Sequence, residues 1–370
     1  MNVLLISDFS YPLQGGTERH VTGVAEYLAS RRLGVHVLSP ARKDEGNCTY
    51  KVNGVIVHKF DLPFMHTSFI VRSMAYFFLG IWLCLKHNIK TVHSFYTMTA
   101  IIPAALVARI LGKKYIATLF EWELFDWQRK SKWKWPISRW AFGTADAITT
   151  IGPTFQRKME AEFPEKQVID IGNWIDDKYF KLQKPIGKPS KKNEILFMGR
   201  LVRNKGIYVL LDALSKIEDD LKFRLILAGP PVEQQKVREI SKRFRILDRI
   251  EFRGFVPDGK MAALYSECDI LVFPSILRGG MAFVVMEAMA YGKPVVCSDD
   301  LGLREGVGGA GIIVKKGDSK GLAQAIKKLL TDRAAYSACS RIAIERVKTY
   351  FLKDKVLPLY YRVHRNVAGK

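Results

Sequence analysis

Several features that would assign this sequence to a special class of protein are missing. Its five cysteines are odd in number and never form a C-x-x-C pair, so we expect a reducing compartment and neither a disulfide framework nor a cysteine-based zinc site. The longest apolar run, Met74–Leu85, is shorter than the ~20 residues of a membrane-spanning helix. No basic leader precedes the first apolar segment, so we expect no signal peptide. These absences predict a protein that is soluble or peripherally bound to a membrane, on the cytoplasmic side.

What is present is an ordinary globular composition with a strongly basic charge. The chain has 370 residues, of which 48% are hydrophobic and 25% charged, and this composition excludes disordered and fibrous classes. At about 150 residues per domain, the length favours two domains. Fifty-eight basic side chains against 36 acidic ones leave a net charge of +22. Such a charge favours polyanionic partners, namely nucleic acid, anionic lipid or phosphorylated small molecules.

The first half of the chain repeats a strand–helix–strand pattern. Asn2–Ser7 is a continuous apolar run of strand length, typical of a strand buried on both faces. We expect an amphipathic helix from Thr17 to Arg31 and the next strand at Val35–Ser39. This order predicts a parallel sheet. The pattern continues with expected strands at 91–93, 115–119 and 147–150 and an expected helix at 100–111.

A second segment of the same kind follows a break in the pattern. Glycines, prolines and lysines between Ile171 and Asn193 indicate a linker. Further strands, each followed by a helical stretch, are expected at 195–198, 223–227, 250–252, 270–273 and 294–297. We therefore predict two Rossmann-like, doubly wound α/β domains with an interdomain cleft at the carboxyl ends of their sheets. The predicted bounds are 1–172 for the first domain, 173–192 for the linker, 193–350 for the second domain and 351–370 for a C-terminal helix that packs back toward the first domain.

A glycine turn between a strand and a helix is the sharpest signal of a binding site. The strand ends at Pro274, two glycines follow, and a helix is expected from about Ala282. Free backbone N–H groups and the positive helix end favour a diphosphate there. Glu287, inside this helix, is suited to accept two hydrogen bonds from a vicinal diol such as ribose, each worth about 1.5–3 kcal/mol. The alternative for Glu287 is a helix glutamate on a solvated face.

Two further loops carry candidate ligand contacts. Arg200 stands just past a strand end and Lys205 just before the next helix, and both cations are suited to neutralise a leaving diphosphate. Basic loop residues are more often merely solvated, so this signal is weak when taken alone. Gly15 and Gly16 after the first strand allow backbone to approach a ligand closely, although many strand–helix turns contain glycine.

Together these stretches resemble the retaining glycosyltransferases of family 4 (glycosyltransferase group 1), which have the GT-B fold. The matching motifs are, in order, the paired glycines, the G-R-L-x-x-x-K-G loop from Gly199, the L-A-G-P strand end at 227–230 and the E-A-M-A-x-G-K-P-V-V block from Glu287. The resemblance assigns Arg200 and Lys205 to the donor diphosphate as catalytic residues and Glu287 to the nucleotide ribose. It further assigns the phosphate and acceptor loop to Gly15 and Gly16, and donor contacts to Gly229, Gly280, Met281, Ala282 and Phe283.

The sequence departs from the family pattern at two positions. Residue 279, where the first glutamate of an E-x7-E motif is expected, is glycine. The histidine that the family carries after the strand at 115–119 is absent, and Glu121 and Glu123 stand nearby as possible sugar contacts or as surface residues. His93 matches a family histidine that contacts the sugar, but a hydrogen-bonded core histidine is the interpretation we favour. These departures leave the donor sugar open.

Tryptophans alternate with cations in one segment of the first domain. The members that we assign to a membrane-facing surface are Trp127, Lys132, Trp133, Lys134 and Trp135. Tryptophan prefers the headgroup region, and each Lys or Arg near an anionic surface adds about 1 kcal/mol. Phe69–Leu85 is a second candidate for this surface, although we favour a core helix there. No helix-turn-helix, RNP or zinc pattern is evident, so we do not expect nucleic-acid binding.

The resemblance therefore implies a hexosyltransferase that moves a sugar, with retention, from a UDP- or GDP-linked donor. A membrane-facing first domain implies a lipid-linked or phospholipid acceptor, and a protein peripheral on the inner face of the cell membrane. No acidic D-x-D motif is present, so we expect neither a metal nor another cofactor. The alternative is a catalytically silent relative that binds a nucleotide sugar or scaffolds a partner, and Gly279 motivates it.

Overall fold

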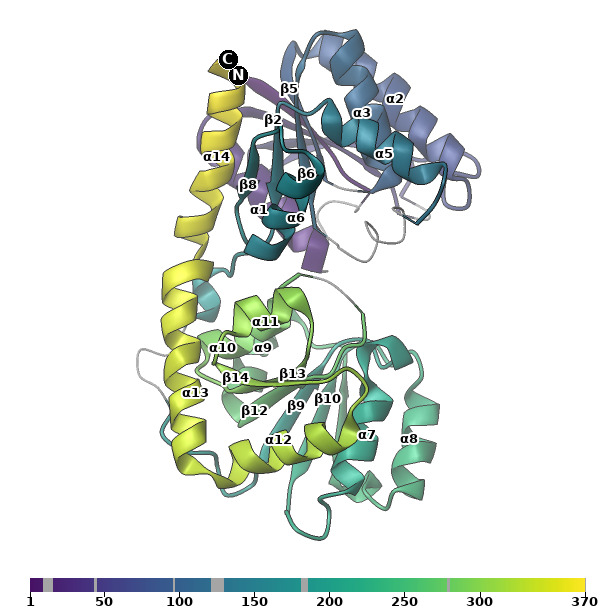
Figure 1. Cartoon of the computed structure of the whole chain (residues 1–370). Helices are drawn as coiled ribbons and strands as arrows, with labels where there is room; N and C mark the ends of the chain where they lie inside the picture. The colour runs from purple at the N-terminus through teal and green to yellow at the C-terminus, as the bar shows by residue number, and fades with distance from the viewer. Residues whose placement is uncertain are drawn as a thin grey trace. The chain divides into compact units, whose positions relative to one another are not determined.

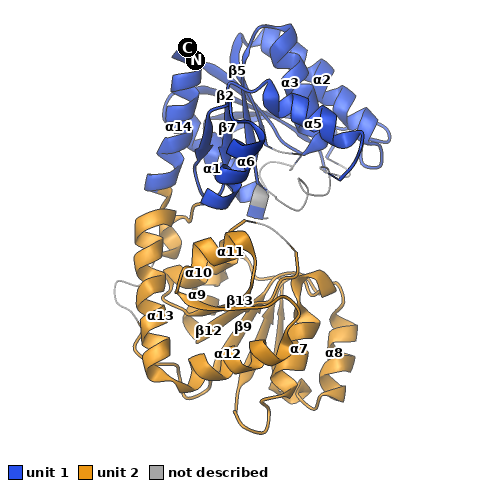
Figure 2. Cartoon of the chain, in the orientation of Figure 1, with its two compact units in different colours: residues 1–173, 354–370 blue, residues 174–353 orange. Residues whose placement is uncertain are grey.

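The computed structural model describes residues 1–8, 16–42, 45–95, 97–120, 130–180, 186–277 and 280–369, except for the side chain of Thr17. The chain forms two compact units (Figure 2). Unit 1 comprises Met1–Asn173 and Asp354–Lys370, and unit 2 comprises Trp174–Lys353. Most of the range 173–192, which we expect to be a linker, is thus part of unit 2. There Ile175 pairs with Leu352 as an isolated parallel bridge.

Unit 1 is built on an eight-stranded sheet in the order β3-β4-β2-β1-β5-β6-β7-β8. Its strands are β1 (Asn2–Ile6), β2 (Gly34–Pro40), β3 (Cys48–Val52), β4 (Val55–Phe60), β5 (Ile89–Phe95), β6 (Lys114–Leu119), β7 (Ala147–Thr150) and β8 (Val168–Asp170). All neighbouring strands run parallel except β3, which pairs antiparallel with β4. Strand order reverses between β1 and β5, and this switch point is where ligands of such sheets bind.

Helices cover both faces of this sheet. They are α1 (Gly16–Ser30), α2 (Phe69–Lys86), α3 (Met98–Ile110), α5 (Lys134–Gly143), α6 (Pro153–Glu162) and α14 (Lys353–Gly369). Figure 1 shows α2, α3 and α5 on one face and α1, α6 and α14 on the other. Ser68 caps α2 by accepting a hydrogen bond from the N–H of Val71, and Thr97 caps α3 in the same way through Ala100.

Unit 2 is built on a six-stranded, fully parallel sheet in the order β11-β10-β9-β12-β13-β14. Its strands are β9 (Glu194–Met198), β10 (Arg224–Ala228), β11 (Ile250–Gly254), β12 (Ile270–Phe273), β13 (Val295–Ser298) and β14 (Gly311–Val314). The central strands are buried on both faces, as their continuous apolar runs predict. Strand order reverses between β9 and β12, so the loops that follow these two strands meet at the switch point.

Helices of unit 2 alternate with its strands. They are α7 (Ile207–Ser215), α8 (Gln234–Arg243), α9 (Asp258–Glu267), α10 (Phe283–Ala290), α11 (Leu301–Val307), α12 (Ser319–Thr331) and α13 (Arg333–Arg346), and the π-turn η4 (Val347–Phe351) leads into α14. The architecture of both units confirms the prediction of two doubly wound α/β domains. The hairpin β3–β4 is an element that the sequence pattern did not predict, because β3 is largely exposed and lacks an apolar run.

Helix α2 corrects one expectation from the sequence. Among the described residues, α2 is the one helix that is long and apolar enough to cross a membrane, by length and composition alone. It spans Phe69–Lys86 and therefore extends beyond the apolar run Met74–Leu85. Of its 18 residues, 28% are buried within the protein. The helix packs on α3 and on β1 and β5, so it is an integral layer of unit 1.

Candidate functional site

The segments that follow β9, β10 and β12 contact one another closely at the switch point of unit 2. Gly206, which closes the loop after β9, has a φ of +80°, and a Cβ added there would lie 1.9 Å from the carbonyl oxygen of Pro274. The N–H of Ile276, in the loop after β12, donates to the carbonyl of Asn204 at 3.1 Å. Gly229, at the end of β10, has a φ of +137°, and a Cβ there would lie 2.1 Å from the carbonyl oxygen of Gly199. Glycine is therefore required at both junctions.

The two predicted cations lie on this loop. Arg200 lies two residues after the end of β9 and is exposed. Lys205 is half-buried, and its Nζ lies 6.0 Å from the ring centroid of Phe273, the last residue of β12. Both charges thus lie at the carboxyl edge of the sheet, where an anionic ligand gains most from them.

The amino end of α10 lies beside the same edge. Ala282 caps the helix in an extended conformation without a side-chain hydrogen bond, so the helix starts one residue later than expected. Met281 is buried, and its Sδ lies 2.2 Å from where a Cβ of Gly306 would stand. Gly280 precedes the cap of α10, Ala282 is that cap and Phe283 is the first residue of the helix, and all three are half-buried. Gly279 lies outside the described residues.

Glu287 is part of the interior of unit 2. Its carboxylate is fully buried, and the hydroxyl of Tyr265 donates to its Oε2 at 2.5 Å. The same hydroxyl lies 3.3 Å from Sδ of Met198, the last residue of β9. Burial, with the charge of Glu287 as a second cause, raises the pKa of Tyr291. The interpretation of Glu287 as a solvated surface residue is wrong, whereas its contact with ribose stays a prediction.

Lys316 is a residue of this edge that the sequence interpretation missed. Its Nζ donates to the carbonyl of Leu277 at 3.1 Å and pairs with Oδ2 of Asp300 at 2.8 Å. Asp300 is buried and also caps α11. The lysine therefore fixes the backbone that enters the glycine loop. Its position two residues beyond β14, at the carboxyl edge of the sheet, is the signal that points to it.

Asp8 marks the corresponding edge in unit 1. It follows β1 at the switch point with β5, and burial raises the pKa of its carboxyl, opposed by hydrogen bonding to Thr97 and by the charge of Arg72. Tyr76 of α2 donates to the carbonyl of Ser7 at 2.8 Å. The end of β1 is thus attached to α2. A lone acidic residue directly after the first strand was the available signal.

Among the other residues predicted for this edge, Gly16 is the exposed first residue of α1. The predicted residues Gly15, Glu121, Glu123 and Trp127 lie outside the described residues.

His93 lies in the core of unit 1. It is fully buried in β5, its Nδ1 lies 3.1 Å from Nε2 of His364, and its Nε2 lies 2.6 Å from the hydroxyl of Thr118. Burial holds the pKa of His93 well below its usual value, so the ring is neutral. Both ring nitrogens are occupied, which agrees with a core histidine and leaves no ring nitrogen for the sugar contact in this arrangement.

An apolar surface covers part of the α2–α3–α5 layer. The exposed large apolar side chains of α2 are Phe69, Ile70, Met74, Phe78, Trp82 and Leu85. Phe78 is 58% exposed, so the core-helix interpretation of this segment holds only for its inner face, where Ala75, Tyr76, Gly80, Leu83 and Cys84 are buried. Between α2 and the β3–β4 hairpin lies a groove of about 790 Å³, lined mainly by apolar side chains. Patches of this kind mark contact with a membrane, a ligand or a protein.

Aromatic and cationic side chains continue at α5. Trp133 is exposed, with Nζ of Lys134 5.2 Å from its ring centroid. Lys132 is exposed and Trp135 half-buried. Helix α5 packs on α3, which packs on α2, so this segment belongs to the same layer as the apolar surface.

Comparison with protein families covers most of the chain. The family model described as glycosyltransferase family 4 matches residues 14–179, and the model described as glycosyl transferases group 1 matches residues 179–346.

Curated relatives align over nearly the full length. Phosphatidyl-myo-inositol mannosyltransferase of Mycobacterium leprae is 25% identical, covering 98% of this chain and 97% of the relative. N-acetyl-alpha-D-glucosaminyl L-malate synthase of Bacillus anthracis is 22% identical, covering 96% and 95%. The phosphatidylinositol N-acetylglucosaminyltransferase gpi3 subunit of Schizosaccharomyces pombe is 22% identical, covering 99% and 81%.

Solved structures share the fold. Sucrose-phosphate synthase from Thermosynechococcus elongatus superimposes with a TM-score of 0.83 at 20% identity, covering 100% of this chain and 99% of that one. HepE from Anabaena in complex with UDP superimposes with a TM-score of 0.78 at 18% identity, covering 99% and 100%.

Proposed function

Because this chain belongs to the glycosyltransferases of group 1 and family 4, with the GT-B fold, we propose that it transfers a sugar from a nucleoside-diphosphate sugar to a lipid acceptor at a membrane surface. The observation that carries the donor half of this proposal is the junction of the β9 and β12 loops at the switch point of unit 2. Arg200, Lys205 and the amino end of α10 all lie at that junction. A diphosphate is the ligand chemistry that two cations and a helix amino end favour.

The donor is a UDP or a GDP sugar in this proposal. UDP is present in the similar structure of HepE, and that supports the nucleoside diphosphate as the class of ligand. Glu287 holds the ribose after its hydrogen bond from Tyr265 rearranges. The identity of the base and of the sugar follows from the experiment below.

The transfer proceeds with retention of configuration at the anomeric carbon. The bond between that carbon and the diphosphate oxygen breaks, and the diphosphate leaves with the electron pair. The acceptor hydroxyl forms the new bond on the same face, and its proton moves to a phosphate oxygen of the leaving group. Arg200 and Lys205 stabilise the charge that grows on the diphosphate, which is the largest contribution that such a site makes to catalysis. No protein nucleophile is needed, so glycine at residue 279 is compatible with turnover.

The acceptor half of the proposal rests on unit 1. The exposed apolar side chains of α2 are suited to enter the interface of a lipid layer, and the exposed Lys86 at the end of α2 favours an anionic one, at about 1 kcal/mol near the surface. Two of the named relatives are described as acting on phosphatidylinositol. Tyr76 connects α2 to the end of β1 at the switch point, so a lipid headgroup held by α2 would lie near the acceptor edge. We accordingly propose a peripheral protein on the cytoplasmic face of the membrane.

A thermal-shift screen of the full chain against UDP and GDP sugars tests the donor, because ligand that binds the folded state raises the Tm by mass action. The donor that raises the Tm is then incubated with vesicles of phosphatidylinositol and, separately, with L-malate as a soluble acceptor. Transfer to the vesicle lipid supports the proposal, and transfer to malate alone refutes the lipid acceptor. A Lys205→Ala variant is the control for chemistry at the proposed site.

A catalytically silent relative is the second candidate, and the glycine at residue 279 favours it. It predicts that a nucleotide sugar raises the Tm while neither sugar transfer nor hydrolysis of the donor is detected. Donor hydrolysis by the native chain that is lost in a Glu287→Ala variant would exclude this candidate.

A further inference from the structure

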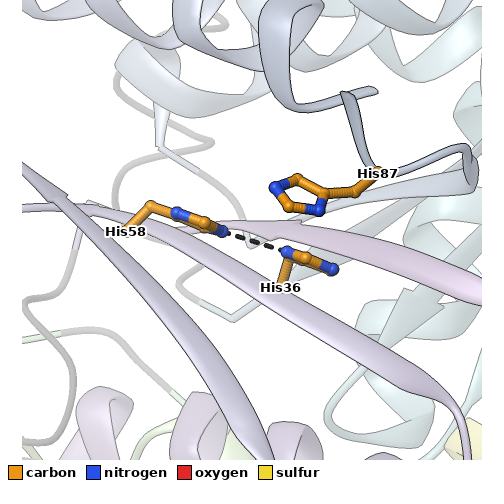
Figure 3. Close-up of side chains that lie close together, drawn as sticks. All are labelled: His36, His58 and His87. Carbon is orange, nitrogen blue, oxygen red and sulfur yellow. Dashed lines mark hydrogen bonds between the residues drawn. The ribbon is translucent and has the colours of Figure 1, made fainter. Parts of the chain in front are cut away.

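Three histidines that are distant in the sequence meet in unit 1. His36 lies in β2, His58 in β4, and His87 is the residue that ends α2. Nδ1 of His36 lies 3.0 Å from Nε2 of His58, and one nitrogen from each of the three rings lies within 4.8 Å of the others. Figure 3 shows the ring of His87 above that of His36, with a centroid separation of 4.3 Å, and the centroid of His87 lies 5.7 Å from that of His58.

We propose that His36, His58 and His87 form a site for a divalent transition-metal ion, with Zn²⁺ as the best match. Three imidazoles with an open fourth position for water are a common zinc ligand set. At a Zn–N distance of about 2.0–2.1 Å, the nitrogens of a tetrahedral site stand ~3.3 Å apart. The observed separations, from 3.0 Å to at most 4.8 Å, reach this geometry through small rotations of the side chains.

A second observation supports the site. Nδ1 of His58 lies 3.1 Å from the hydroxyl oxygen of Thr49 in β3. Histidines that bind metal donate their other ring N–H to an oxygen in this way, which fixes the tautomer and leaves the first nitrogen free to bind. With Nδ1–H of His58 donated to Thr49, its Nε2 carries the lone pair that faces His36.

The cluster does not lie at the carboxyl edge of the unit 1 sheet, where ligands of such sheets bind. Residues His36 and His87 lie near the amino ends of β2 and β5, whereas ligands of parallel sheets bind at the carboxyl ends. The carbonyl of His87 also accepts a hydrogen bond from the side chain of Asn2 at 2.7 Å. A metal ion there would fasten the end of α2 to β2 and β4. The inference does not depend on the proposed function, because it needs neither donor nor acceptor.

Metal content tests the proposal on the full chain, expressed without a polyhistidine tag. We expect the dialysed protein to bind one Zn²⁺ ion per chain in a titration with zinc chloride, and we expect His58→Ala to lose this ion. His66→Ala is the matched control, because His66 is exposed and its imidazole pairs with Asp61 outside the cluster. Thr49→Val should weaken Zn²⁺ binding about 10–100-fold.

A measurement on the native chain keeps the test valid if a variant fails to fold. Co²⁺ bound by three imidazoles and water gives the visible absorption of a tetrahedral cobalt complex, and Zn²⁺ should displace it. Zinc binding that is equal in the native chain and in His58→Ala would overturn the proposal. So would the absence of both a stoichiometric zinc ion and the cobalt absorption.

Discussion

Substitution of Gly206 by alanine tests the loop junction that carries the donor site. The new Cβ would stand 1.9 Å from the carbonyl oxygen of Pro274, and contacts below 3.0 Å are essentially never seen, so the loop must move by about 1.1 Å (3.0 − 1.9). That movement strains the hydrogen bond from Ile276 to Asn204, worth about 0.5–1.5 kcal/mol. Overpacking adds about 1–3 kcal/mol. The positive φ of +80° adds about 1–3 kcal/mol more for a residue with a side chain.

Gly317→Ala provides a matched control in the same unit. Gly317 has a φ of +76° but no atom within 4 Å of an added Cβ, so alanine there carries only the backbone strain. The difference between the two variants isolates the contact with Pro274, and we expect Gly206→Ala to be less stable by about 1.5–4.5 kcal/mol. For a unit of this size, each kcal/mol lowers the Tm by about 2–4 °C.

The assay is thermal unfolding of both variants, repeated with the nucleotide sugar that stabilises the native chain. We expect Gly206→Ala to unfold at a Tm lower than that of Gly317→Ala by at least ~3 °C and to lose most of the ligand-induced rise, because the Arg200–Lys205 loop is displaced. Gly317→Ala should keep the full rise. Equal Tm values, or an undiminished ligand effect in Gly206→Ala, would refute the reasoning that this junction forms the donor site.

Three further predictions concern catalysis, membrane binding and pH. Lys205→Ala should lower kcat far more than donor affinity, since the lysine acts on charge that grows in the transition state, and steady-state kinetics would show unchanged kcat if this role is absent. Phe78→Glu should abolish sedimentation with anionic vesicles, whereas Phe255→Glu, at an equally exposed residue of unit 2, should not; equal loss in both would exclude α2 as the membrane surface. Burial lowers the pKa of His20 to about 4 and that of His364 to about 3, below the value of about 6.5 in the unfolded chain. Between about pH 6.5 and pH 4 the unfolded chain therefore binds a proton at each histidine that the folded protein does not bind. Each histidine then lowers the free energy of unfolding by about 1.4 kcal/mol per pH unit as the pH falls. Unfolding free energies measured from pH 7 to 4.5 should fall less steeply in His364→Gln, and an unchanged slope would contradict neutral burial of this ring.

The repeated pattern of apolar strands and amphipathic helices predicted the two sheets because burial on both faces leaves a direct record in composition. The pattern predicted β1 and β9 to within one residue. It did not predict β3, β4, β8 or β14. For β3 the reason is that a strand at the edge of a sheet keeps exposed polar residues and lacks an apolar run. Glycines at 206 and 229 were visible as motif positions. Glycine is required at these positions because the backbone that follows another strand lies within contact distance, and that contact depends on which strands become neighbours.

Helix α2 and Glu287 show what side-chain packing decides. The apolar composition of α2, within a chain of alternating strands and helices, predicts a core helix. Whether the outer face of such a helix is covered depends on elements that are far away in the sequence. Glu287 is surrounded in sequence by apolar residues, and only its packing against Tyr265 decides that a carboxylate is buried there. Both outcomes rest on side-chain packing, which local sequence does not encode.

The sequence by itself determined the class of protein: the order of strands and helices, the glycine loops and the basic loop residues are local features, and they sufficed for the fold and the family. The tertiary structure decided which of those residues lie close together and which are buried. The convergence of His36, His58 and His87, the burial of His93 and the open face of α2 each depend on neighbours brought together by sheet order. Sheet order is a property of the whole chain, because the free energy that selects it is summed over contacts between segments that are remote in sequence.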